Sequence, residues 1–201
     1  MGRLIVGTFL TVDGVYQAPG GQDEDREGGF EHGGWCANYW DEDMGNRIVD
    51  VTASSDALLL GRKTYDIFSS YWPNASSDDP VAAHLNNVPK YVVSRTRDTA
   101  DWNNTTILKG DVAEEVARLK EQYDEIAVTG SGQLVQTLLK DDLVDVFGLW
   151  VFPVVIGTGK RLFGDGTIPG ALNVTESTVS TTGVVITTYE RAGDIPYGEA
   201  G

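Results

Sequence analysis

The sequence predicts an α/β fold in which a mostly parallel central sheet has helices on both faces and an antiparallel hairpin at its C-terminal end. Short apolar runs alternate with amphipathic segments, an order typical of parallel sheets that are covered on both faces. The last two runs alternate better between polar and apolar residues, and a three-residue link containing Gly183 joins them, as in a hairpin. Because 41% of the 201 residues are hydrophobic, we expect residues 1–201 to form a single domain.

Strands are expected where short, apolar and often β-branched runs stand between turn-forming residues. The longest run, 144–156, is interrupted by Gly148 and Pro153. The expected strands, in chain order, are 4–12, 57–60, 91–94, 126–129, 144–156, 172–180 and 184–190. We expect the first five to be buried on both faces, because they are apolar nearly throughout.

Helices are expected between these strands. The clearest spans 111–123, where Asp111 can cap the first turn and Glu114 follows three residues later, as in a capping box. Shorter helices are expected at 44–53, from Thr64 onward, and at 133–139. His84 lies in the polar stretch 76–87 and is expected to be a surface residue.

A long loop, residues 17–40, follows the first strand and is expected to act as a lid. Residues 17–34 contain six glycines and five acidic residues but no valine, leucine or isoleucine. Such a segment cannot build a core, and long loops in compact domains are commonly lids or binding loops. Trp35, Tyr39 and Trp40 end it, so we expect its last part to fold back onto an apolar surface.

The charge of the chain excludes several kinds of partner. With 15 basic and 30 acidic residues, the net charge is −15 and the pI is about 4.3, which disfavours nucleic acid and anionic membranes as partners.

No apolar run approaches the ~20 residues of a membrane helix, and the N-terminus lacks a signal-peptide pattern, so we expect a cytoplasmic protein. One cysteine and two histidines without paired spacing predict no metal site.

Three strand ends carry Gly, Ser, Thr or Arg directly before a helix or turn. In open α/β sheets, ligands bind beyond the carboxyl ends of the strands, where helix N-termini offer free N–H groups to phosphate. Four of the fifteen basic residues lie there, including Arg97, so we expect an anionic ligand with several phosphates. Val135 replaces the third glycine of the dinucleotide fingerprint, which disfavours an ordinary NAD-binding domain. The predicted cofactor-binding residues are Gly61, Arg62, Lys63, Thr64, Ser94, Arg95, Thr96, Gly130, Ser131, Gly132, Gln133 and Leu134.

These residues and their order resemble the dihydrofolate reductase-like superfamily. The chain is most similar to the C-terminal reductase domain of the riboflavin-biosynthesis deaminase/reductase and its stand-alone relatives. The resemblance covers nearly the whole chain, and its motifs are at 10–14 (Leu-Thr-Val-Asp-Gly), 60–65 (Leu-Gly-Arg-Lys-Thr-Tyr), 91–95 (Tyr-Val-Val-Ser-Arg), 128–132 (Val-Thr-Gly-Ser-Gly) and 153–163 (Pro-Val-Val-Ile-Gly-Thr-Gly-Lys-Arg-Leu-Phe).

The resemblance implies a three-layer dihydrofolate reductase-like fold and an NADPH-dependent reductase, of the dihydrofolate reductase or 5-amino-6-(5-phosphoribosylamino)uracil reductase type. The reaction would be hydride transfer to a pterin-like or pyrimidine-like heterocycle. Arg62, Arg95 and Arg97 are the candidates for the extra phosphate of NADPH. Relatives also imply a homodimer formed through strands of the C-terminal half. A single cysteine excludes the zinc deaminase domain of the bifunctional enzyme.

Candidate catalytic and substrate residues lie near the first strand and the lid. Asp13 ends that strand, and a lid closed over it would raise its pKa and make it a proton donor; the alternative is a turn residue in Asp-Gly. Lys160 and Arg161 are candidates for a substrate phosphate, or for a subunit contact. The aromatic candidates for substrate stacking, each with core packing as its alternative, are Tyr16, Trp35, Trp40, Tyr65, Phe68 and Phe152.

Two other functions stay open at this point. The chain can be a dinucleotide- or ligand-binding protein that has the fold without the reaction, since the proton donor is weakly assigned. It can also be a reductase that uses a flavin or a deazaflavin in place of NADPH. Hydrolase and kinase functions are disfavoured, because the sequence has neither a Gly-x-Ser-x-Gly elbow nor a phosphate-binding Walker loop.

Overall fold

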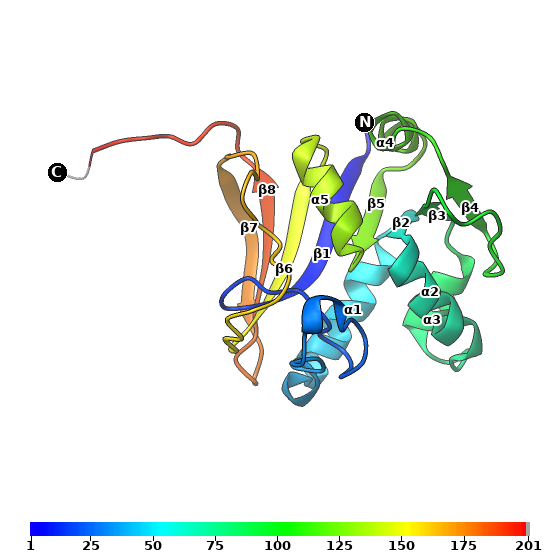
Figure 1. The fold of residues 1–201 in the computed structure, drawn as a ribbon, viewed down its shortest axis with the longest axis horizontal. Coiled ribbons are helices and arrows are strands. Elements are labelled where there is room, and N and C mark those ends of the chain that lie inside the picture. Colours follow the sequence, from blue (N-terminus) through cyan, green and yellow to red (C-terminus); the bar gives the residue numbers. More distant parts are fainter. Residues whose placement is uncertain (200–201) are drawn as a thin grey trace.

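A computed structural model, which describes residues 1–199, contains one eight-stranded sheet with the order β4-β3-β2-β5-β1-β6-β8-β7 (Figure 1). Strands β1 to β6 are parallel to their neighbours among themselves, and β8 pairs antiparallel with both β6 and β7. The predicted fold class is therefore confirmed. The strands are β1 (Arg3–Thr11), β2 (Ala57–Gly61), β3 (Lys90–Val93), β4 (Thr105–Leu108), β5 (Glu125–Thr129), β6 (Val146–Phe152), β7 (Leu172–Val179) and β8 (Val185–Arg191).

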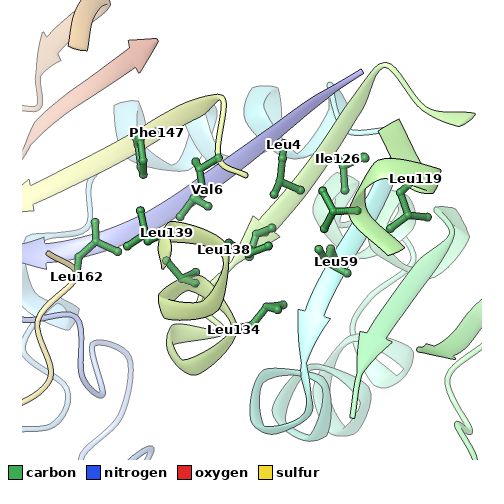
Figure 2. Close-up of a cluster of buried hydrophobic side chains, with 14 of the residues drawn as sticks. Leu4, Val6, Leu59, Leu119, Ile126, Leu134, Leu138, Leu139, Phe147 and Leu162 are labelled. Carbon is green, nitrogen blue, oxygen red and sulfur yellow. The ribbon is translucent and has the colours of Figure 1, made fainter. Parts of the chain in front are cut away.

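Five α-helices cover the two faces of the sheet. Helices α4 and α5 lie on one face, where Leu134, Leu138 and Leu139 of α5 join one buried cluster with residues of β1, β2 and β6 (Figure 2). On the other face, α1, α2 and α3 pack against Leu58 and Leu60. The helices are α1 (Glu42–Ala53), α2 (Arg62–Tyr71), α3 (Pro80–Asn87), α4 (Val112–Gln122) and α5 (Gly132–Lys140), and short 3₁₀ turns span Glu27–Gly29, Ala37–Tyr39 and Trp72–Asn74.

The alternation of side chains along β2 lets this short strand pack against the helices on both faces of the sheet. Along β2, Leu58 and Leu60 point toward the layer of α1, α2 and α3, whereas Leu59 joins the cluster under α4 and α5. Successive side chains of a strand alternate between faces, so a strand that is apolar throughout is buried on both. All four residues of β2 before Gly61 are buried, as the sequence predicts.

Two elements were not predicted, and one predicted strand is shorter. Helix α3 forms in the stretch 76–87, because Asp79 caps it by accepting from Val81 N at 2.9 Å and Pro80 occupies its first turn. Strand β4 pairs with β3 at the edge of the sheet. Strand β6 ends at Phe152 because Pro153 has no N–H to donate to a ladder.

The C-terminal hairpin forms as predicted. The turn between β7 and β8 includes Gly183 with φ +86, a left-handed conformation that glycine adopts without steric cost. Strand β7 is exposed along all eight residues and forms one edge of the sheet. Among residues 1–199, no helix combines the length and the apolar character needed to cross a bilayer.

Candidate functional site

Two of the predicted ligand-binding turns are joined directly by hydrogen bonds. Strands β3, β2 and β5 are neighbours, so their carboxyl ends meet at one edge of the sheet. The Ser131 hydroxyl accepts from Gly61 N at 2.9 Å and donates to Thr129 O at 3.0 Å. In return, Thr64 Oγ1 accepts from Ser131 N at 2.8 Å. The turn after β2 and the turn after β5 therefore form one unit.

The turn after β5 has an unusual backbone conformation. Gly130 and Ser131 are consecutive left-handed residues, with φ +57 and +53. A Cβ atom at Gly130 would lie 3.3 Å from Thr64 Oγ1, so a side chain there would press on the neighbouring turn. Non-glycine residues in this conformation need support, which Ser131 receives from its hydrogen bonds to Gly61 and Thr64.

The helices that begin at this unit lack side-chain caps, unlike the other three. Asp41, Asp79 and Asp111 cap α1, α3 and α4 by accepting from the first backbone N–H groups. Helices α2 and α5 begin after Gly61 and Ser131, neither of which makes a side-chain cap hydrogen bond. Their first N–H groups are thus left for solvent or a ligand, and the positive end of each helix dipole faces the joined turns.

Two of the basic residues predicted at the site pair with Asp66. Arg62 Nη1 lies 3.0 Å from Asp66 Oδ2, and Arg97 Nη2 lies 2.5 Å from Asp66 Oδ1. The turn after β3 is held by Ser94, whose buried hydroxyl accepts from Thr96 N at 3.3 Å and from Arg97 N at 3.0 Å. Arg95 is exposed, and no carboxylate in the described chain pairs with it. The third turn is thus linked to α2 through Arg97.

The hydrogen bonds around Asp13 favour its ionised form. Its carboxylate accepts from Thr11 Oγ1 at 2.6 Å, Ile156 N at 3.2 Å and Gly157 N at 2.8 Å, and Arg161 Nη2 lies 3.3 Å away. The hydrogen bond from Thr11, together with the two backbone N–H groups, holds the pKa of Asp13 far below its ordinary value, although burial acts in the opposite direction. The expected raised pKa is wrong: Asp13 fastens the segment 153–162 to the end of β1.

We therefore expect Asp13→Asn to lower the free energy of unfolding by about 2 kcal/mol at pH 7, because an amide cannot accept at both positions. The ionised carboxylate stabilises the fold above its unfolded pKa, near 4, and this stabilisation is lost as the pH falls below that value. Urea unfolding at pH 7 and pH 3 measures both effects. Asp165→Asn, at an exposed position, is the control, and equal stability of the two variants at pH 7 would contradict this role.

Two of the aromatic residues predicted to stack on a substrate are core residues. Tyr65 is 1% exposed, and its hydroxyl accepts from Trp102 N at 3.2 Å. Phe152 is 0% exposed and has Trp35 edge-on at 5.3 Å between ring centroids. Phe68 is partly buried and packs in the layer of α1, α2 and α3. Burial removes Tyr65 and Phe152 from any stacking role in this conformation, because neither ring is open to a ligand.

Tyr16 and Trp40 are not fully buried. The ring of Tyr16 covers the first residue of α5, since a Cβ at Gly132 would lie 2.1 Å from Tyr16 Cε2. Trp40 is 42% exposed and lies 5.7 Å from Phe9 and 6.5 Å from Trp150 between ring centroids. The sequence analysis missed Phe9 and Trp150, which the paired register of β1 and β6 brings together.

Two residues of the last predicted turn differ in their accessibility. Gln133 is exposed, whereas the side chain of Leu134 is buried between α5 and the sheet (Figure 2). Leu134 can therefore offer a ligand only its backbone N–H. Trp35 is also engaged, because its indole N–H donates to Gln17 O at 2.8 Å.

The predicted lid is ordered by its own contacts. Gln17 is buried, and its side-chain amide donates to Asp25 O at 3.1 Å and to Glu27 O at 2.9 Å. Lys160, predicted as a phosphate ligand, pairs with the carboxylates of Asp25 and Glu27, both at 2.6 Å. The sequence analysis missed these two acids, although the abundance of carboxylates in the loop was a signal that its basic neighbours would be paired.

Two hollows are found in the described part of the chain. A hollow of about 250 Å³ lies beside the loop and is bounded by Gln17, Glu27, Gly28, Gly29, Phe30, Thr158, Gly159 and Lys160. A wider, shallow hollow of about 630 Å³ lies around Met1, Asp56 and Lys120, at the amino ends of the strands and away from the joined turns. Within residues 1–199, no three His, Cys, Asp or Glu side chains gather as metal ligands would.

The fold and the joined turns define a dihydrofolate reductase-like α/β protein. The profile of the RibD C-terminal domain family matches residues 3–186, and the chain belongs to this family of reductase-like domains. YyaP of Bacillus subtilis, an uncharacterized protein, is 30% identical over 197 residues, which are 95% of this chain and 96% of YyaP.

Solved structures show the same fold. A Shewanella sp. PV-4 protein with a proposed place in riboflavin biosynthesis is 24% identical, with a TM-score of 0.68 over 94% of this chain and 99% of that one. A diaminohydroxyphosphoribosylaminopyrimidine deaminase/5-amino-6-(5-phosphoribosylamino)uracil reductase from Thermotoga maritima is 14% identical, with a TM-score of 0.63. The match covers 95% of this chain but 57% of that protein.

Proposed function

We propose that this protein is an NADPH-dependent reductase that transfers a hydride to a small pyrimidine-like or pterin-like heterocycle. The observation that carries the proposal is the pair of uncapped helices, α2 and α5, which begin at two turns joined by Ser131 and Thr64. Two helix N-termini and nearby arginines suit a ligand with more than one phosphate group. The name of the Thermotoga maritima relative supports a pyrimidine-like substrate.

The residues present fit NADPH by their chemistry. The N–H groups at the starts of α2 and α5, with Lys63 and Thr64, would hold the diphosphate. Arg62, Arg95 and Arg97 would bind the additional ribose phosphate, and Arg95 is the arginine of the three without a carboxylate partner in the described chain. The glycine at 130 leaves the turn free of a side chain that would press on Thr64.

When bound, NADPH would supply the hydride, and the protein would orient the two ring systems and exclude water. Trp40, with Phe9 and Trp150 behind it, offers an exposed aromatic face for a planar heterocycle. Asp13 keeps the segment 153–162 against the end of β1 as an ionised residue. We assign it a positioning role, since its low pKa is unsuited to donating a proton.

The test is a titration of the purified protein with NADPH and with NADH, followed by quenching of tryptophan fluorescence. We expect NADPH to bind at least about tenfold more tightly, because one charge-assisted phosphate contact contributes about 1.5–3 kcal/mol. Arg95→Gln should remove this preference, whereas Arg118→Gln on the exposed side of α4 should keep it. Equal affinity for both nucleotides would contradict the phosphate site.

A titration in which neither NADPH nor NADH binds would favour a different function. If neither nucleotide binds, a ligand-binding protein without the reaction, or a flavin- or deazaflavin-dependent reductase, becomes the better proposal. An absorbance spectrum of the purified protein distinguishes these two, because a bound flavin absorbs in the visible range. If NADPH binds, its oxidation in the presence of pterin and pyrimidine acceptors identifies the substrate class.

The predicted homodimer is also a proposal. It is supported by the exposed edge strand β7, which presents Val174 and Val179, at 58% and 62% exposure, beside unpaired backbone groups. Sedimentation velocity measures the mass in solution, and a monomer at micromolar concentration would contradict this assembly.

A further inference from the structure

Four charged side chains from three distant segments form one cluster next to the proposed phosphate site. Lys160, after β6, places its ammonium 2.6 Å from Asp25 Oδ2 and 2.6 Å from Glu27 Oε2. Lys63, in the first turn of α2, places its own ammonium 2.8 Å from the same Glu27 oxygen and 3.7 Å from Asp25 Oδ1. Two loop carboxylates thus neutralise two lysines, one of which belongs to the proposed cofactor turn.

The loop presents these carboxylates in a fixed arrangement. The buried side chain of Gln17 donates to the backbone oxygens of Asp25 and Glu27, and its Oε1 accepts from Lys160 N at 3.1 Å. Elsewhere in the loop, Gly33 packs so closely against residues 21–22 that a Cβ there would lie 2.5 Å from Gly21 O. The carboxylates are therefore held by the conformation of residues 17–34, and moving them means moving the loop.

The carboxylates of the loop and an anionic ligand would compete for the same two lysines, Lys63 and Lys160. The chain carries twice as many acidic as basic residues, so Lys63 and Lys160 are scarce positive charges. A phosphate group brings a charge of roughly −1.5 to −2, and two ammonium groups cannot neutralise it together with Asp25 and Glu27. The side chains of the two lysines and Glu27 are 27% to 52% exposed, and such ion pairs are individually weak enough for a ligand to displace.

We propose that Asp25 and Glu27 form an ionic latch: they occupy Lys63 and Lys160 as internal competitors of a phosphate-bearing ligand, whose binding releases the loop 17–34. The inference rests on the proposed function for the identity of the ligand as a dinucleotide, but the competition itself concerns any diphosphate. Hydrogen bonds from Lys160 and Lys63 to Glu27 hold the pKa of this carboxyl at about 2, so the competitor stays charged at neutral pH.

The test uses the full-length double variant Asp25→Asn/Glu27→Gln. Without any ligand, we expect amide hydrogen exchange in residues 17–34 to accelerate several-fold, because the loop loses its ionic contacts. Inorganic pyrophosphate and NADPH should each bind roughly tenfold more tightly to the variant than to the wild type. In the wild type, pyrophosphate should itself accelerate amide exchange in residues 17–34. In the variant, pyrophosphate should change this exchange rate little.

The control is Glu31→Gln/Asp101→Asn, which makes the same change of net charge at two exposed residues. It should change neither the loop exchange nor the affinity by more than about twofold. Weaker pyrophosphate binding to the latch variant, unchanged loop exchange, or no pyrophosphate binding to either protein would overturn the latch. If pyrophosphate behaves as expected but NADPH does not bind, the proposed function fails while the latch stands.

Discussion

Replacing Lys90 by methionine is expected to lower the free energy of unfolding by about 2 kcal/mol at pH 7, and the melting temperature by several degrees. Lys90 begins β3 and is 0% exposed. Its ammonium donates to Leu85 O at 2.7 Å and Val88 O at 2.8 Å, and it lies 4.4 Å from the centre of the Trp102 ring.

Lys90 is needed because Pro89, directly before it, has no N–H to donate to the last turn of α3. In a longer helix, the carbonyl of Leu85 would accept from the N–H of residue 89, but residue 89 is a proline and has none. Lys90 supplies the missing donor to the last turn of α3. Methionine keeps a similar volume but leaves two buried carbonyls without a partner, each at a cost of about 1–3 kcal/mol. Removing the buried charge offsets part of that loss.

The pH dependence separates this role from simple packing. Burial lowers the pKa of Lys90 to about 8, below the unfolded value near 10.5. Between these values the unfolded chain binds more protons, so the stability contributed by Lys90 rises with pH. The difference in unfolding free energy between wild type and Lys90→Met should widen by about 2 kcal/mol from pH 8 to pH 10.

Urea unfolding across this range measures the effect, with Lys109→Met as the control. Lys109 is half exposed and pairs with Asp98 at the surface, so its replacement should change stability by no more than about 0.5 kcal/mol. A gap between wild type and Lys90→Met that stays constant from pH 8 to pH 10 would show that Lys90 remains charged throughout.

The sequence predicted the parts of the fold that local chemistry determines. The helix over 111–123 forms as α4 because Asp111 caps it, accepting from Ala113 N and Glu114 N. Asp79 caps α3 in the same way, but this helix was not predicted because most residues around Asp79 are polar. The buried face of α3 consists of Val81, Ala82 and Leu85. Apolar periodicity over eight residues is too short to be seen beside such polarity.

The meeting of two predicted turns follows from the order of the strands, whereas contacts between distant segments could not be predicted. The turns at Gly61 and Gly130 were found because the carboxyl ends of parallel strands meet at one edge. The pKa of Asp13 was expected to rise, and it falls because its partners, Ile156 and Gly157, lie more than 140 residues away. Sequence gives no sign of which N–H groups will face a carboxylate, and those groups decide whether its pKa rises or falls.

The joined turns make Gly130 the position where a substitution should most affect ligand binding. Gly130→Val is expected to weaken NADPH binding by at least about tenfold and to lower the free energy of unfolding by about 2 kcal/mol. A β-branched residue is strained at φ +57, and its Cβ would lie 3.3 Å from Thr64 Oγ1. Relief of this strain moves Ser131, whose hydroxyl and N–H connect the turns after β2 and β5.

The matched control is Gly183→Val in the hairpin between β7 and β8. Its φ is +86 and its nearest contact is Pro153 Cγ at 3.9 Å, so it carries the same backbone strain far from the joined turns. Both variants should lose stability, but Gly183→Val should bind NADPH like the wild type. Titration at a temperature where both variants are fully folded makes the comparison. If Gly130→Val keeps its affinity while losing stability like the control, the turn after β5 serves the fold alone, and the cofactor site lies elsewhere.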